Sequence, residues 1–133
     1  QLLKLMAEMR IKVVPVPGAS SLMAALSLCP FDMETFTFLG FLPPKTEQRA
    51  AVLQKHKASD YPIILMDTPY RLGKLLDEVS TTFGRLQQIF LALDLTLPSE
   101  ATYLGTVQDV TMQVQGRKAE FILIMDRPQR RKF

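Results

Sequence analysis

The sequence has 133 residues, about the length of one domain with a single core. Apolar residues make up 47% and charged residues 22%, which excludes a disordered or fibrous protein, and the net charge of +3 is too mild to define a partner. The longest apolar runs fall far short of the ~20 residues that span a bilayer, so no membrane association is expected. No signal peptide is recognisable, and Cys29 has no second cysteine to pair with. Together these features predict a soluble, cytoplasmic protein.

An apolar stripe opens the chain. Leu2, Leu5 and Met9 recur at the spacing of one helix face, which needs a surface to cover it. Because the chain also begins at Gln1, we expect a piece of a longer protein, although a processed terminus would look the same. Residues 1–17 would then be the end of a preceding domain and a connector. The uncovered stripe also predicts self-association.

A proline-punctuated run and a small-residue turn come next. Residues 13–17 are β-branched and interrupted by prolines, which fits an edge strand or an extended connector. Gly18, Ala19, Ser20 and Ser21 then lead into a helix over residues 22–26 that a serine caps. The turn offers small residues and free backbone amides to a ligand. An ordinary capped turn explains the same spacing.

The middle of the chain alternates strand and helix. Residues 36–42 predict a strand that ends at a proline pair. A polar helix over residues 46–57 follows, with Thr46 as its cap and Ala50 on its apolar face, beside a valine and a leucine. Residues 61–66 are continuously apolar, which is typical of a central strand covered on both faces.

The remaining elements continue this alternation. A helix over residues 69–83 ends at Gly84. Residues 89–93 and 120–125 predict two more buried strands. Residues 105–114 fit either a strand or a helix, and the helix is preferred. The whole pattern predicts an α/β layered domain with a central mixed sheet flanked by helices.

Two polar segments follow buried strands. Residues 66–71 combine an acid, a hydroxyl, a phenol and a guanidinium, and residues 94–100 combine two carboxylates with a hydroxyl. Because ligands of open α/β sheets bind outside the carboxyl ends of the strands, these segments predict a shared cleft. Helix capping or a surface ion pair is the structural alternative for Asp67 and Arg71. No metal site is expected, since His56 is the only histidine and no cysteine is placed to share a metal with it.

These segments, in this order, resemble the carboxy-terminal half of the tetrapyrrole methylase family, whose members transfer a methyl group from S-adenosylmethionine. The matching segments are Val13–Ser21, Phe36–Pro43, Asp67–Arg71, Asp94–Thr96, Gly105–Thr106 and Glu120–Leu123. The second and third are most similar to the branch that methylates a ribose 2′-hydroxyl in small-subunit ribosomal RNA. That branch more often has Glu-Ser-Pro-His-Arg at residues 67–71, and Lys where this chain has Leu97.

The resemblance implies two α/β domains with S-adenosylmethionine between them. Residues 18–133 would form the carboxy-terminal subdomain, and the missing domain would supply a Gly-rich loop and an acidic motif. Six positions would contact the cofactor: Gly18, Ala19, Ser20, Met66, Asp67 and Thr96. The first three would line the methionine or ribose side, the next two would pack on the cofactor, and the last would approach the adenine. Backbone near Ala119 and Glu120 would complete the adenine pocket.

The acceptor and the proton-accepting base are less defined. Asp67 and Glu100 are candidate bases by chemistry alone, and the base can equally lie in the missing domain. Ribosomal RNA or the ribosomal subunit is the implied substrate, and a homodimer is expected. The basic residues 127–132 fit either a phosphate contact or a solvated tail. Two alternatives stay open: a tetrapyrrole acceptor with the same cofactor, and a non-catalytic dimerisation or binding module with the same fold.

Overall fold

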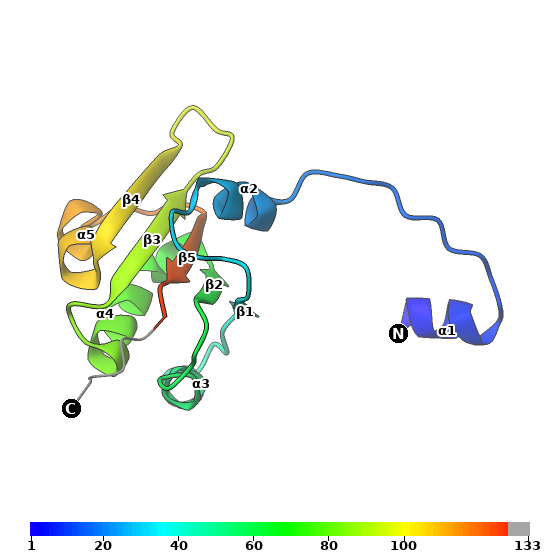
Figure 1. Cartoon of the computed structure of the whole chain (residues 1–133), viewed down its shortest axis with the longest axis horizontal. Coiled ribbons are helices and arrows are strands. Elements are labelled where there is room, and N and C mark those ends of the chain that lie inside the picture. The colour runs from blue at the N-terminus through cyan, green and yellow to red at the C-terminus, as the bar shows by residue number, and fades with distance from the viewer. Residues whose placement is uncertain (128–133) are drawn as a thin grey trace.

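A computed structural model describes residues 1–127 and contains a five-stranded sheet packed between helices (Figure 1). The strands are β1 (Thr37–Phe41), β2 (Ile63–Asp67), β3 (Gln88–Leu93), β4 (Ala101–Thr106) and β5 (Phe121–Met125). Their order across the sheet is β1-β2-β5-β3-β4, with β1 and β2 parallel and the other neighbours antiparallel. The predicted mixed α/β fold is therefore confirmed.

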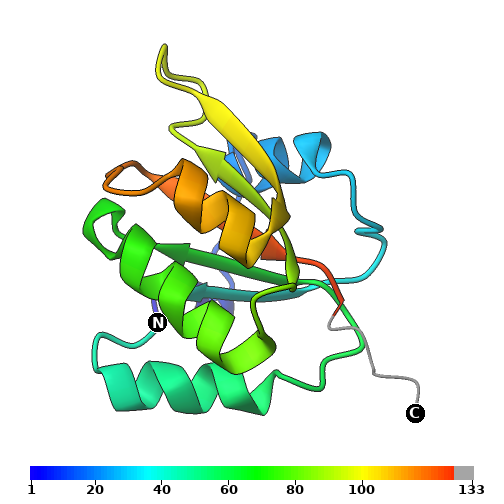
Figure 2. The same ribbon diagram turned by 90° about the vertical axis from the view of Figure 1, so that its left-hand side faces the viewer.

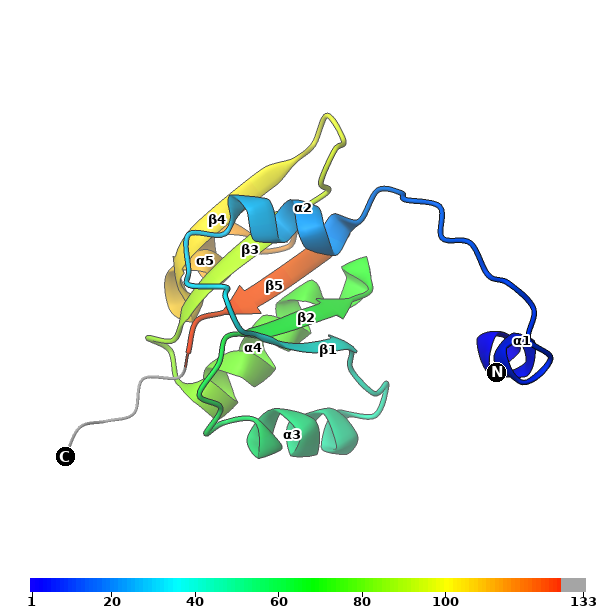
Figure 3. The same cartoon turned by 45° about the vertical axis from the view of Figure 1, so that its right-hand side comes forward.

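Helices cover the two faces of the sheet unequally. The helical elements of the chain are α1 (Leu2–Glu8), α2 (Ser21–Leu28), α3 (Thr46–Lys55), a 3₁₀ turn (Pro69–Arg71), α4 (Leu72–Phe83) and α5 (Val107–Gln113). Figure 2 shows α3, α4 and α5 on one face, and Figure 3 shows α2 on the other. Because strand side chains alternate, Ile63 and Leu65 pack under α3 to α5, whereas Ile64 and Met66 pack under α2. The sheet thus separates two apolar layers.

Most predicted elements form close to their expected bounds. The four predicted strands match β1, β2, β3 and β5 to within one or two residues. The helix predicted over residues 69–83 begins as a 3₁₀ turn and ends at Gly84, whose φ of 98° is readily adopted by glycine. The ambiguous segment 105–114 contains α5, as preferred, and the Thr106 hydroxyl caps it by accepting the Asp109 N–H at 3.1 Å.

Residues 13–17, predicted as either an edge strand or an extended connector, form an extended connector without strand pairing. Two details predicted for the helix over residues 46–57 were wrong. Thr46 is the first residue of α3 and not its cap, because its hydroxyl accepts hydrogen bonds from Arg49 and Lys74 instead. Ala50, predicted to lie on the apolar face of this helix, is exposed, whereas the charged Arg49 is buried.

The edge strand β4 was not predicted. It pairs antiparallel with β3, and its exposed Thr102 and Leu104 alternate with the half-buried Tyr103. This period of two is the signal that identifies a half-buried strand. A glycine at position 105 weakened that signal.

The amino-terminal helix lies away from the sheet (Figure 1). No residue of α1 is buried, and Leu2 and Leu5 are 66% and 52% exposed. The apolar stripe is therefore uncovered in this structure. The assignment of residues 1–17 to a preceding domain stays a prediction.

Several smaller expectations have simple outcomes. Across residues 1–127, no helix is both long enough and apolar enough to cross a membrane. Cys29 is half-buried, and burial raises the pKa of its thiol, as expected for an unreactive cysteine. Of the basic tail, Arg127 lies 3.5 Å from Asp32 in an exposed ion pair, and residues 128–133 lie outside the described part of the chain.

Candidate cofactor-binding site

A pocket of about 220 Å³ lies on the α2 face of the sheet, where β3 ends and β5 begins. Its lining residues are Ser21, Met66, Ala92, Asp94, Leu95, Leu97, Glu120, Phe121 and Ile122. Most of these side chains are apolar, and two carboxylates and a hydroxyl accompany them. This is the position in which open α/β sheets bind ligands, beside the carboxyl ends of their strands.

Asp94 joins the loop after β3 to the start of β5. Its Oδ1 accepts the Glu120 N–H at 3.1 Å, and its Oδ2 accepts the Ser99 hydroxyl at 2.9 Å. Its own N–H donates to the Glu120 carbonyl at 2.8 Å. Asp94 therefore fixes two walls of the pocket relative to each other.

The backbone of this loop adopts a rarely populated conformation. Asp94 and Thr96 have φ values of 47° and 70°, and a β-branched residue in the left-handed region is uncommon. Such residues cost ~1–3 kcal/mol each and persist where the surroundings enforce them. Here Glu100 contributes, because its carboxylate accepts the Thr96 N–H at 2.6 Å. The loop is thus held in one shape by its own side chains.

The pocket brings together part of the predicted cofactor set. Met66 and Glu120 line it directly. Thr96 is exposed and lies between two lining leucines, and Ala119 is buried next to Glu120. Ser20 caps α2 by accepting the Met23 N–H at 3.3 Å, which positions the following residue, Ser21, at the pocket. Residues 18–20 themselves are exposed and stand outside the lining.

Asp67 lies on the opposite face of the sheet from Met66. It shares the strand parity of Ile63 and Leu65, which pack under the helices of the other layer. Its carboxylate is 2% exposed, and Oδ1 accepts the Thr68 N–H at 2.7 Å and an Arg71 N–H at 3.1 Å. Oδ2 has no hydrogen-bond partner among the described residues.

The predicted shared cleft is therefore formed in part. Met66 and Asp94 meet at the pocket, whereas the acid, phenol and guanidinium of residues 67–71 do not line it. Glu100 is also outside the lining, and it holds the Thr96 amide. The pocket floor, formed by Ala92 and Ile122, was not identified beforehand. Its signal was the alternation within two predicted strands, which places these residues on the same face as Met66.

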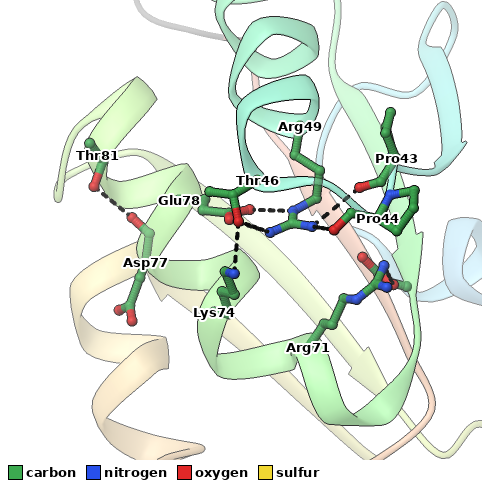
Figure 4. A network of polar contacts seen from close by, with 10 residues as sticks. Pro43, Pro44, Thr46, Arg49, Arg71, Lys74, Asp77, Glu78 and Thr81 are labelled. Carbon is green, nitrogen blue, oxygen red and sulfur yellow. Dashed lines mark hydrogen bonds and ion pairs between the residues drawn. The ribbon is translucent and has the colours of Figure 1, made fainter.

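A buried ion pair supports the neighbouring edge of the sheet (Figure 4). Arg49 is 2% exposed and donates to the two carboxylate oxygens of Glu78 at 2.9 and 2.7 Å. It also donates to the carbonyls of Pro43 and Pro44 at 3.2 and 2.6 Å. The hydrogen bonds that Arg49 donates to the Glu78 carboxylate raise the pKa of Arg49, so the guanidinium stays charged. The turn after β1 is thereby fastened to α4.

The lining fits one part of a larger ligand that combines a flat apolar ring with cationic substituents. Met66, Ala92 and Ile122 offer apolar surface, and Asp94 and Glu120 offer negative charge. A volume of about 220 Å³ is below the ~300–1,000 Å³ of complete small-molecule sites, so this pocket would form one wall. Within residues 1–127, no group of three or more His, Cys, Asp or Glu side chains is arranged to hold a metal ion.

An open mixed sheet with a pocket beside its strand ends defines an α/β ligand-binding domain. Comparison with known proteins narrows this class. Residues 1–111 match the sequence model of the Tetrapyrrole (Corrin/Porphyrin) Methylases, and the chain belongs to this family.

Two relatives match most of the chain in sequence. The chain is 34% identical over 122 residues to "Ribosomal RNA small subunit methyltransferase I" of Neisseria meningitidis serogroup B (strain ATCC BAA-335 / MC58), covering 89% of this chain and 42% of that protein. It is 34% identical over 119 residues to the protein of the same name from Xylella fastidiosa (strain 9a5c), covering 86% and 44%. The chain thus spans less than half the length of these relatives.

Solved structures support the fold. A uroporphyrin-III-C-methyltransferase from Thermus thermophilus superposes with a TM-score of 0.60 at 20% identity, over 94% of this chain and 56% of that one. A cobalt precorrin-4 methyltransferase gives a TM-score of 0.60 at 18% identity, over 93% and 56%. At these identities the likeness establishes the shared fold alone.

Proposed function

We propose that this chain is the carboxy-terminal part of an S-adenosylmethionine-dependent methyltransferase that methylates a ribose 2′-hydroxyl in small-subunit ribosomal RNA. The pocket beside the ends of β2 and β3 carries this proposal, because its apolar floor and acidic rim fit part of that cofactor. The names of the two relatives described above support ribosomal RNA as the acceptor. The complete activity is assigned to the longer protein, since this chain spans less than half of those relatives.

S-adenosylmethionine, when bound, supplies a methyl group on a positively charged sulfonium. Met66 and Ala92 would contact the flat ring, as part of the apolar floor. The backbone of residues 94–97 would face the polar edge of the adenine. Asp94 and Glu100 fix the shape of this backbone segment. The carboxylate of Asp94 also favours a cationic ligand over an anionic one. Gly18, Ala19 and Ser20 would approach the methionine or ribose side from the turn before α2.

Methyl transfer to a hydroxyl requires alignment of donor and acceptor and removal of one proton. Asp67 and Glu100 remain candidate proton acceptors. Both lie outside the pocket lining, and Glu100 already accepts the Thr96 amide. This arrangement favours a base contributed by another part of the longer protein. Asp67 would then shape the turn between β2 and α4 through its bond to Arg71.

The proposal extends to the context of the chain. A preceding domain would close the pocket with a Gly-rich loop and an acidic motif. The exposed stripe of α1, with Leu2 at 66% exposure, would pack on that domain or on a second copy in a homodimer. Action on the small ribosomal subunit would place the protein in the cytoplasm.

Two other functions are weighed against this one. A tetrapyrrole acceptor is favoured by the names of the solved structures, although their identity to this chain is 20% or lower. A non-catalytic module with the same fold is disfavoured by the ordered loop at the pocket, whose strained Asp94 and Thr96 a purely structural domain would not need.

Methylation assays on the longer protein test the proposal. The Ser21→Trp substitution puts a large ring at an exposed lining position, whereas Ser27→Trp puts the same ring near the other end of α2. We expect methyl transfer from S-adenosylmethionine to small-subunit ribosomal RNA in the wild type and in Ser27→Trp, with at least a tenfold loss in Ser21→Trp. Methylation of a tetrapyrrole in place of RNA, or no effect of Ser21→Trp, would contradict it.

A further inference from the structure

A second cavity, of about 460 Å³, lies on the α4 and α5 side of the sheet. It lies between the start of α4 and the turn that leads from α5 to β5, and its lining includes Pro69, Tyr70, Lys74, Met112, Arg117 and Lys118. We call it the α4–α5 groove. It shares no lining residue with the candidate cofactor pocket.

The groove combines an exposed aromatic ring with positive charge. Tyr70 is 80% exposed, and the Lys118 ammonium lies 5.3 Å from the centre of its ring. Lys74 is exposed and donates to the Thr46 hydroxyl at 2.9 Å, as Figure 4 shows. Asp77 is the carboxylate in the lining, against three cationic side chains. The net character is that of a site for a polyanion.

One wall of the groove is fixed in place. Arg117 donates to the Tyr103 hydroxyl at 2.9 Å and to the Ser99 carbonyl at 2.9 Å. It therefore ties the turn that carries Lys118 to the edge strand β4 and to the loop after β3. This anchoring holds the turn next to Lys118 in one position, so a ligand would meet a preformed wall on this side of the groove.

The groove and the cofactor pocket are close along the chain. Lys118 lines the groove, and Glu120, two residues later, lines the pocket. Pro69 lines the groove, and Met66, three residues earlier, lines the pocket. With ~3.8 Å between consecutive Cα atoms, these pairs of Cα atoms lie within about 8 and 12 Å. The pocket lies on the α2 face of the sheet and the groove on the α4 and α5 face. The two sites are therefore close neighbours on opposite faces of the sheet.

We propose that the α4–α5 groove binds the single-stranded RNA that flanks the nucleotide presented at the cofactor pocket, an inference that rests on the proposed function. Tyr70 offers a ring face on which an unpaired base stacks, and Lys74 and Lys118 neutralise backbone phosphates. Base stacking on a protein ring requires an unstacked strand, so the groove selects single-stranded RNA over a duplex.

Fluorescence anisotropy with a labelled single-stranded RNA tests the groove on this chain. Tyr70→Ala should weaken binding roughly tenfold, whereas Tyr61→Ala, which removes a 49% exposed ring before β2, should not. Lys118→Glu should weaken binding and reduce the slope of log K against log salt by at least one, and Arg85→Glu, at an exposed site of another cavity, should change affinity less. A duplex of the same sequence should bind more weakly.

The outcomes separate the groove from the methyltransferase proposal. Equal losses in the groove and control variants, or RNA affinity independent of Tyr70, would overturn the groove and indicate non-specific attraction or an acidic protein partner. Heparin binding that matches RNA binding in every variant would overturn it as well. Each variant is also titrated with S-adenosylmethionine. Cofactor binding together with RNA binding that the groove variants leave unchanged refutes the groove alone. RNA binding that depends on the groove, with no methyl transfer to small-subunit ribosomal RNA by the longer protein, supports the groove and refutes the proposed function.

Discussion

The Arg49 side chain shows how one residue fixes a turn between elements. It emerges from a helix of mainly polar sequence, yet its guanidinium is buried and meets Glu78 and the carbonyls that follow β1. Each of those acceptors would lose a partner if the guanidinium were removed. A buried pair contributes little relative to an apolar replacement, but breaking one partner leaves an uncompensated charge.

We therefore expect Arg49→Ala to lower the free energy of unfolding by about 3 kcal/mol. This is at the lower end of the range for broken buried pairs, because the Glu78 side chain keeps 15% of its surface exposed. Urea denaturation measures the change, and Arg85→Ala, at an exposed position, should stay within about 0.5 kcal/mol of wild type. A loss in Arg49→Ala no larger than that of Arg85→Ala would show that the network is not formed.

Among the elements of the fold, the loop after β3 is held in shape by side-chain hydrogen bonds and not by regular secondary structure. Asp94→Ala removes the acceptors of the Glu120 amide and the Ser99 hydroxyl, so the Glu120 amide should exchange with solvent about tenfold faster. Asp94→Asn keeps one oxygen acceptor and should recover most of the protection. Native-state hydrogen exchange checks both variants, and unchanged Glu120 protection in Asp94→Ala would mean that the loop is held by other contacts.

The sequence predicts the interior elements better than the edges. Residues 63–66 and 121–125 are continuously apolar because both of their faces are covered, and this made β2 and β5 recognisable. By contrast, β4 is half-exposed, so propensity alone did not identify it. Thr46 is a good cap by residue type, but tertiary contacts with Arg49 and Lys74 determine its hydroxyl partners.

The candidate site shows the same limit. Met66 and the loop at residues 94–100 were identified from their place after buried strands. Sequence proximity also grouped Asp67 with Met66, although consecutive strand residues face opposite sides of a sheet. The face that each residue occupies became clear only once α2 was known to cover the pocket side.

The exposed apolar stripe of α1 affects how the whole molecule associates. Leu2 and Leu5 are 66% and 52% exposed, and burying them against another copy would remove apolar surface from water. We expect this chain to self-associate, and the double variant Leu2→Lys with Leu5→Lys to dissociate it. Sedimentation velocity follows the change, with Leu86→Lys, at a position 78% exposed, as the control. A wild-type chain that stays monomeric at high concentration would contradict the expectation.

The pocket between α2 and the ends of β2 and β3 is the proposed binding site of S-adenosylmethionine. The most direct measurement is an NMR titration of the ¹⁵N-labelled chain with that cofactor, which detects even weak binding to one wall of a site. Binding at this pocket should give saturable shifts at the amides of Leu95, Thr96 and Glu120, and these shifts should be lost in Ser21→Trp but not in Ser27→Trp. Shifts confined to the cavity near Gly84, or none at saturating cofactor, would contradict it.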